Sequence, residues 1–321
     1  MPAYDPSIWI APARILVDAT MEPIQGTRFQ PTGFPNLGAA QYQLSDGTEM
    51  LLVESAQSMA NRLEATAWDE GTDDLVEALR GIPYVRVKVG GVETDTIREA
   101  HRLNSPYLAQ IWPDLRLRAG IPETKKEEGS ANVDRRKLAS AVFYYDPNSV
   151  LHGVFLEKIV GGARLTRMLS AFIEARGVKI AASGGVKNDR LDPSGKEIGS
   201  GAAAGFGNVP FSRTEYVAES ITASFSLDTT LLRSYGLPSA ASELLVSLGL
   251  WKISHFLDGD ARLRTACDLK VNKVSVTAPS VSALPSSADL EASIRRSIEA
   301  CNSDGLFAKP AITTVEYKAK G

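Results

Sequence analysis

The chain has 321 residues, of which 44% are hydrophobic and 23% are charged, and its formal net charge is −3. This composition excludes a disordered chain, because enough apolar side chains are present to form a core. No apolar run approaches the roughly 20 residues that span a bilayer, and no basic stretch precedes an apolar one at the start, so we expect neither a membrane protein nor a secretory signal. The two cysteines, Cys267 and Cys301, are too few for a disulfide framework, which favours buried thiols in a cytoplasmic protein.

The charge is unevenly distributed along the chain. Residues 1–80 contain 4 Lys or Arg and 12 Asp or Glu, residues 81–190 contain 18 and 12, and residues 191–321 contain 13 and 14. A basic middle segment fits a local track for phosphates. It fits equally well a chain whose copies attract one another, and it also fits a surface of mixed, solvated charges.

The first half of the sequence predicts strands around one amphipathic helix. Residues 14–18 are short and β-rich and predict a strand, and the polar residues 21–48 predict a long loop. From about Met50, apolar residues recur at helical spacing, which predicts a helix with a buried face. Residues 85–89 alternate between valine and basic side chains, the pattern of a half-buried strand.

The second half mixes helices and strands. Residues 94–145 show weak periodicity and predict an insertion, with a charged segment at 125–130. The elements predicted after it are a strand over 151–156, a helix over 165–176 that ends at Gly177, a strand over 178–182, a flexible glycine-rich loop over 191–208, a strand over 221–227, a helix from Pro238 to Phe256, a strand over 265–276 and a C-terminal helix over 286–304 that opens with a Ser286–Asp289 capping box.

This order predicts an α+β fold in a single domain. It is compatible with a βαββαβ core that carries large insertions. Core strands and helices are expected near residues 12–90 and 150–280, with the insertion at 94–145 between them.

Signatures of catalysis are missing. Residues 199–204 match the letters of a dinucleotide-binding loop, but no strand is predicted before them and no helix after them, as such a loop requires. Of the three histidines, His255 ends a helix and favours packing, whereas His101 and His152 lie in polar stretches and are candidates for contact. No carboxylates show a paired spacing. We therefore expect no enzyme activity, no metal and no cofactor.

Several short segments suggest RNA binding instead. They combine Arg, Lys, Asn, Gln and His, which bind phosphates and 2′-hydroxyls, with glycines that let the backbone approach closely. Phe29 follows Arg28 and is a candidate for stacking on a base. The candidate RNA-binding residues are Gln25, Arg28, Phe29, Gln30, Asn61, Arg62, His101, Arg102, Asn104, Asn148, His152, Lys187, Asn188 and Arg190. The alternative for Arg62 and Arg102 is an ion pair with a carboxylate of the protein itself, such as Glu64.

Seven collinear blocks of the sequence resemble one CRISPR-associated family. They lie at residues 13–18, 25–35, 54–64, 100–106, 146–155, 183–190 and 205–211. The family is the backbone subunit of type I-G (formerly I-U) Cascade surveillance complexes, in the RAMP superfamily. The resemblance implies a modified RNA-recognition-motif (ferredoxin-like) palm with large inserted fingers and thumb elements. It also implies several copies wound helically on one CRISPR RNA, which pairs with target DNA while other Cascade subunits complete the complex.

Two other functions stay open. Some related backbone subunits of type III complexes cleave RNA with a loop aspartate, and Asp18, Asp189 or Asp192 would serve a metal-dependent ribonuclease of that kind. A small-molecule enzyme that uses the glycine loop at 199–204 is the third hypothesis. A non-catalytic subunit that grips the RNA backbone is the function we expect, because a protein that accepts any guide sequence has no use for strong base readout.

Overall fold

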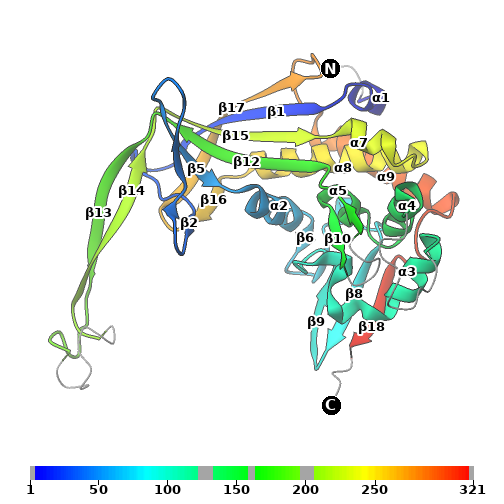
Figure 1. Cartoon of the computed structure of the whole chain (residues 1–321), viewed down its shortest axis with the longest axis horizontal. Coiled ribbons are helices and arrows are strands. Elements are labelled where there is room, and N and C mark those ends of the chain that lie inside the picture. Colours follow the sequence, from blue (N-terminus) through cyan, green and yellow to red (C-terminus); the bar gives the residue numbers. More distant parts are fainter. Residues whose placement is uncertain (1–3, 122–132, 158–162, 196–205, 318–321) are drawn as a thin grey trace.

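A seven-stranded antiparallel sheet forms the centre of the molecule (Figure 1). The computed structural model describes residues 4–121, 133–157, 163–195 and 206–317. In spatial order the strands of this sheet are β16 (Ala261–Arg264), β17 (Cys267–Ala278), β1 (Ile15–Pro23), β15 (Ser220–Leu227), β12 (Leu169–Arg176), β5 (Glu49–Glu54) and β4 (Gln41–Gln43).

Four of these strands have the arrangement of an RNA-recognition motif. Along the chain the order is β1, helix α2 (Ala56–Ala65), β12, β15, helix α8 (Ser239–Asp258) and β17. Across the sheet the order is β17, β1, β15 and β12, so the first and third strands of the motif lie in the middle. Neighbouring strands are antiparallel throughout. This is the ferredoxin-like βαββαβ topology, which confirms the predicted α+β fold with a modified RNA-recognition-motif palm.

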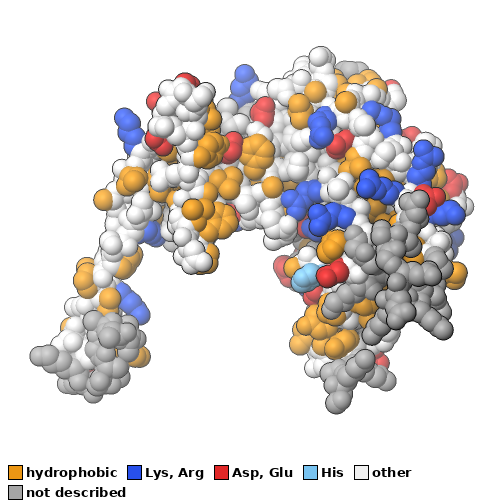
Figure 2. Space-filling model, in the orientation of Figure 1, with side chains coloured by type: hydrophobic (Ala, Val, Ile, Leu, Met, Phe, Trp, Pro, Cys, Tyr) orange, Lys and Arg blue, Asp and Glu red, His pale blue; other side chains and the backbone are white. Residues whose placement is uncertain are grey.

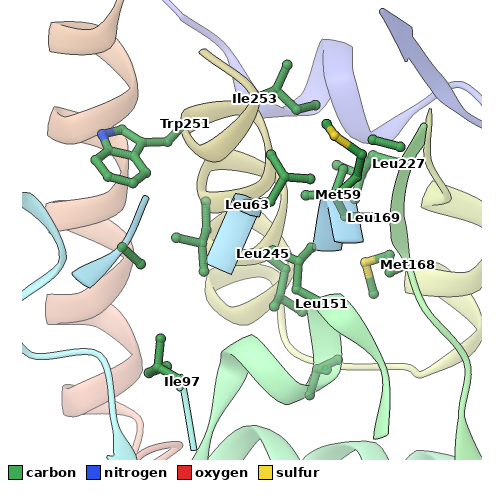
Figure 3. Packing of buried hydrophobic residues seen from close by; sticks show 14 of the residues in the cluster. Met59, Leu63, Ile97, Leu151, Met168, Leu169, Leu227, Leu245, Trp251 and Ile253 are labelled. Carbon is green, nitrogen blue, oxygen red and sulfur yellow. The ribbon is translucent and has the colours of Figure 1, made fainter. Parts of the chain in front are cut away.

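Strand alternation determines which face of the palm is covered. On β15, Ile221, Ala223, Phe225 and Leu227 are buried, while the serines and threonines between them remain partly exposed. Helices α2 and α8 pack on the buried face (Figure 3). The labelled core residues from these helices and strands are Met59 and Leu63 of α2, Leu245, Trp251 and Ile253 of α8, Leu169 of β12 and Leu227 of β15.

Three further helices of the described residues flank the palm. Their bounds are α1 (Pro6–Ile10), α7 (Thr229–Ser234) and α9 (Ser287–Ser303). Helix α9 packs on α8 and begins where the sequence predicts, because the Ser286 side chain accepts a hydrogen bond from the Asp289 amide (3.2 Å). No helix in the described ranges is long and apolar enough to cross a membrane. Both cysteines are buried free thiols, and burial raises the pKa of Cys267 to about 11 and that of Cys301 to about 12.

The sheet curls until its two ends approach each other. Arg264 at the β16 end donates to the Glu54 carboxylate at the end of β5 and to the carbonyl of Gln30 (3.1 Å). The Gln30 amide donates to the carbonyl of Ala266 in the β16–β17 turn (2.8 Å), and the Thr32 amide donates to the carbonyl of Val53 in β5 (3.1 Å). Residues 29–32 therefore close the curled sheet, which gives the block at 25–35 a structural role.

A long hairpin, which we name the arm, continues β12 and β15 beyond the sheet. It consists of β13 (Lys179–Lys187) and β14 (Val209–Val217), paired over their full length. Figure 1 shows that it projects away from the palm. A second small ribbon, β2 (Gly33–Phe34) and β3 (Gly38–Ala39), lies near its base. The glycine loop of the dinucleotide hypothesis, at 199–204, falls outside the described residues.

A separate lobe is inserted between α2 and β12. Its elements are β6 (Trp68–Asp69), β7 (Asp74–Leu75), η1 (Glu77–Leu79), β8 (Tyr84–Val89), β9 (Val92–Asp95), η2 (Arg102–Asn104), η3 (Pro106–Ile111), α3 (Trp112–Arg118), α4 (Arg135–Tyr145), α5 (Pro147–His152), β10 (Val154–Leu156) and β11 (Ala163–Leu165). The C-terminal strand β18 (Ile312–Tyr317) returns to this lobe and pairs in parallel with β8. The strand predicted at 85–89 thus lies in the lobe and not in the palm.

The structure corrects four predicted elements. Residues 169–176 form strand β12, so the helix predicted over 165–176 is wrong; alternate residues of this strand are buried. The predicted loop at 21–48 contains β2, β3 and β4. The helix expected from Met50 starts at Ala56, because 49–54 pair with β12. Residues 151 and 152 end α5 and do not belong to the strand predicted there.

Candidate nucleic-acid interface

The arm and the lobe lie on either side of a hollow (Figures 1 and 2). Figure 2 shows Lys and Arg side chains gathered on the lobe side and hydrophobic side chains over the β2–β3 ribbon. Two grooves in this part of the molecule contain residues that the sequence predicts as RNA contacts. We call them the arm groove and the lobe groove.

The arm groove has a cavity of about 560 Å³ between residues 23–28, the base of the arm and the β16–β17 turn. Gln25 and Arg28 lie in it with exposed side chains, as their polar segment predicts. Glu215 of β14 is buried beneath them and pairs with Arg213 (2.5 Å) and more loosely with Arg28 (3.7 Å). Glu215 thus faces two cations, and Arg262, Asp260 and Asp268 also line the groove, so three cations and three carboxylates lie there.

The arm has two different faces, because successive residues of a strand point to opposite sides. Lys179, Ser183, Phe211, Arg213 and Lys187 fall on the face that lines the arm groove. We call this the cationic face. The opposite face carries the uncharged residues Ile180, Ala182, Val186 and Pro210.

Phe211 is the aromatic centre of the cationic face. Its side chain is 51% exposed and lies across Gly185, its partner on β13, where an added Cβ would come within 3.2 Å of the ring. Arg213 and Lys187 flank it on the same face. An exposed aromatic ring between cations is the arrangement with which proteins hold single-stranded nucleic acid.

The tip of the arm contains Asn188 and Arg190, both exposed, and two of the three candidate catalytic aspartates. Asp189 accepts hydrogen bonds from the amides of Leu191 (2.9 Å), Asp192 (3.0 Å) and Gly207, which lower its pKa and identify it as a turn-building residue. Asp18 is not in a loop but within strand β1. Its carboxylate accepts a hydrogen bond from the Ser224 hydroxyl (2.7 Å). Among the described residues no three metal-ligating side chains form a cluster.

The lobe groove has a cavity of about 560 Å³ and brings four predicted residues together. His101, Arg102, Asn104 and His152 all line it, although they come from two segments about 50 residues apart. Only His101 among them has an exposed side chain. Other lining side chains, which the sequence pattern does not single out, include Gln57, Phe155, Glu157, Arg164 and Arg167.

These additional residues give the lobe groove its binding chemistry. The guanidinium of Arg164 stacks on Phe155, 4.8 Å from the ring centroid, and both side chains are exposed. Arg167 donates to the carbonyl of Ala56 (2.9 Å) and to the Gln57 side chain (2.8 Å), and burial together with the charge of Arg102 lowers its pKa. The groove thus presents two arginines, a histidine and one carboxylate, that of Glu157, at a partly apolar surface. The arginines outnumber the carboxylate, which suits a ribose–phosphate chain.

The structure places several predicted contact residues in the interior instead. Phe29 is 1% exposed and pairs with the backbone of Tyr216, so the prediction that it stacks on a base is wrong. The side chains of Arg102, Asn148 and His152 are also buried and are not exposed for contact with RNA. Asn104 is 8% exposed.

The ion-pair alternative applies to both arginines in question. Arg102 pairs with Glu64. Arg62 donates to the carbonyl of Leu263 (2.5 Å) and lies 3.6 Å from Glu54. Asn61, in contrast, is exposed on α2 and bonds only to Gln57 (3.2 Å) among the described contacts.

A chain of buried polar groups lies behind the lobe groove. Lys252 of α8 donates to the Asn148 side chain (2.7 Å), and burial lowers its pKa to about 8. Burial raises the pKa of Asp146 to about 6. His152 is buried with both ring nitrogens unpartnered, and burial, reinforced by the charges of Lys252 and Arg102, holds its pKa well below the ordinary value. His255 stacks on Trp251 (3.7 Å between centroids), in keeping with the packing expected for it.

Residues 15–180, just over half of the chain, match the family model of CRISPR-associated protein GSU0053. The chain belongs to this family. The family model thereby confirms that the chain is a CRISPR-associated protein, as the resemblance seen in the sequence implies. No curated protein sequence matches it.

Two solved structures resemble this GSU0053 family member in shape. A chain of a "CRISPR RNA-guided surveillance complex, pre-nicking" is 12% identical, with a TM-score of 0.43, over 82% of this chain and 75% of that one. Csc2 of Thermofilum pendens is 8% identical, with a TM-score of 0.33, over 95% and 80% of the two chains. The strand order of the central sheet defines the fold of this family member.

Proposed function

We propose that this chain is a non-catalytic backbone subunit of a type I-G Cascade complex that binds CRISPR RNA. Several copies would polymerise helically along one guide and display it for pairing with target DNA, in contact with other Cascade subunits. Family membership supports a place in a CRISPR system. The observation that carries RNA binding is the cationic face of the arm, where Phe211 lies between Arg213 and Lys187 beside Gln25 and Arg28.

The proposed contacts read the backbone of the RNA and not its sequence. Arginine and lysine neutralise phosphates irrespective of the base, and an aromatic ring stacks on any base. Base pairing with target DNA would then supply the specificity. Absence of catalysis is part of the proposal, and two observations support it: Asp18 lies within strand β1 and not in a loop, and the Asp189 carboxylate is engaged by three backbone amides.

Replacement of Lys187 or Phe211 by alanine tests this function. Lys187→Ala is expected to weaken two guides of unrelated sequence equally and to reduce the slope of log affinity against log salt by about 0.7. Phe211→Ala is expected to cost about 1–3 kcal/mol of binding with little change in slope. Filter binding across a salt series measures both, and the RNA recovered after incubation with magnesium is expected to be intact.

The matched controls are exposed residues that line neither of the two grooves. Phe172→Ala removes a ring that is 38% exposed on the open face of the palm, and Arg295→Ala removes a cation from α9. Both controls should bind RNA as the wild type does. If the arm variants also bind normally, or if a loss is confined to one guide sequence, backbone recognition by the arm is excluded.

A further inference from the structure

Arg102 has a backbone conformation that side-chain-bearing residues seldom adopt. Its φ is +49°, in the left-handed region, and it is one of three non-glycine residues with positive φ among those described. Its side chain is buried, with 8% of the residue exposed, at the wall of the lobe groove. Backbone strain of this kind persists only where surrounding contacts impose it, and it is found preferentially at ligand-binding sites.

The contacts that impose this conformation come from both the palm and the lobe. The Nε and Nη2 atoms of Arg102 each donate to one oxygen of Glu64 (both 2.7 Å), and Nη1 donates to the carbonyl of Gly153 (3.0 Å). Glu64 also accepts from Asn148 (2.8 Å), whose oxygen accepts from Lys252 (2.7 Å). A single buried chain of hydrogen bonds thus connects α8, α5 and α2 to residue 102.

This series of buried hydrogen bonds ends at the lobe groove, the surface that the RNA would meet. His101, the residue before Arg102, is exposed in the lobe groove, and Arg102 itself begins the short turn η2 that ends at Asn104. Gly153, the third anchor, tolerates no side chain, because an added Cβ would lie 2.7 Å from the amide nitrogen of Arg167. Both walls of the groove are therefore fixed through the guanidinium of Arg102.

We infer that Arg102 is a positioning residue of the lobe groove: paired with Glu64, it holds His101 and the following turn in the strained conformation that receives RNA, without touching the RNA itself. This inference rests on the proposed RNA-binding function. A glycine would adopt the same backbone conformation without strain. A buried ion pair is by itself weak evidence for stability, so preorganisation of the groove is the better account of an arginine at this position.

The test compares Arg102→Lys, which keeps the charge but loses the paired bonds, with Arg102→Gly, which removes the strain and the anchor together. Arg164→Ala, at the exposed rim of the same groove, is the reference for direct contact. Guide RNA is titrated at low temperature, the active fraction is determined from the stoichiometric end point, and the dissociation constant is taken per active molecule. Thermal melting identifies conditions in which every variant is folded.

Both Arg102 variants are expected to bind RNA roughly tenfold more weakly per active molecule, with the salt slope of the wild type, because no phosphate contact is lost. Arg164→Ala is expected to lower that slope by about 0.7. Glu64→Gln, which breaks one of the paired bonds at nearly constant shape, should repeat the Arg102 effect and serves if an Arg102 variant does not fold.

Three outcomes overturn the inference or its basis, and they differ. Folded Arg102 and Glu64 variants with wild-type affinity would leave Arg102 with a purely structural role. A slope reduced by about 0.7 in Arg102→Gly, which removes the charge, would make Arg102 a direct phosphate contact. Normal binding by Arg164→Ala and by the arm variants as well would instead refute the proposed function.

Discussion

Replacement of Phe307 by alanine is expected to lower the free energy of unfolding by about 3–5 kcal/mol. Phe307 is 1% exposed, and its ring lies 5.5 Å from that of Phe143 in α4. The adjacent Ala308 amide donates to the carbonyl of Tyr144 (2.9 Å). The C-terminal segment is thereby pinned to the inserted lobe, and loss of the ring leaves a cavity at that junction. Urea unfolding followed by tryptophan fluorescence measures the change.

Phe172→Ala is the matched control for this experiment. Phe172 is 38% exposed on the open face of the palm, so its removal should change stability by no more than about 0.5 kcal/mol. Equal destabilisation by the two variants would contradict the packing described for the C-terminal segment.

Acidification from pH 7.5 to 5.5 is expected to destabilise the protein through His152. The folded protein keeps this histidine neutral, since its pKa lies well below the ordinary 6.5. The unfolded chain takes up the proton near pH 6.5, so it binds more protons than the folded one as the pH falls. The contribution of His152 to stability is therefore present above pH 6.5 and declines below it, by at most about 1.4 kcal/mol per pH unit.

The variant His152→Leu isolates this effect. Asp146, whose pKa burial raises to about 6, works in the opposite direction, because the folded protein then binds its proton first. Asp146 is present in both proteins and largely cancels from their difference. The free energy of unfolding of the wild type minus that of His152→Leu should decrease as the pH falls. A difference that is constant with pH would show that His152 titrates alike in the folded and unfolded states.

Elements with one clear period were predictable from the sequence. Residues 221–227 alternate without ambiguity and form β15, and the apolar spacing from Pro238 to Phe256 gives α8. Strand β12 was not predictable in this way, because its alanines, Glu174 and Arg176 are compatible with a helix. Its strand conformation comes from pairing with β15 on one side and β5 on the other, which local preference does not reveal.

The candidate site was predictable in location but not in detail. The polar segments at 101–104 and 148–152 do converge on one groove. Which of their side chains face solvent was not predictable, because Arg102 and Asn148 are satisfied by Glu64, a partner distant in sequence. Phe211 was not among the predicted contacts, although it falls within a block of resemblance and alternates with Arg213 along a strand.

The strand order of the palm also constrains how the chain folds as it is synthesised. Strand β1, at residues 15–23, pairs with β15 and β17, whose last residue is 278. Strand β1 is therefore without either neighbour until most of the residues that follow it have been translated. Contacts so distant in sequence form slowly, and an unpaired strand is prone to association with other chains in the meantime. The lobe elements between α2 and β12 mostly contact elements that are near them in sequence, so their pairing has no such delay. The exception is β8, whose partner β18 is translated near the end.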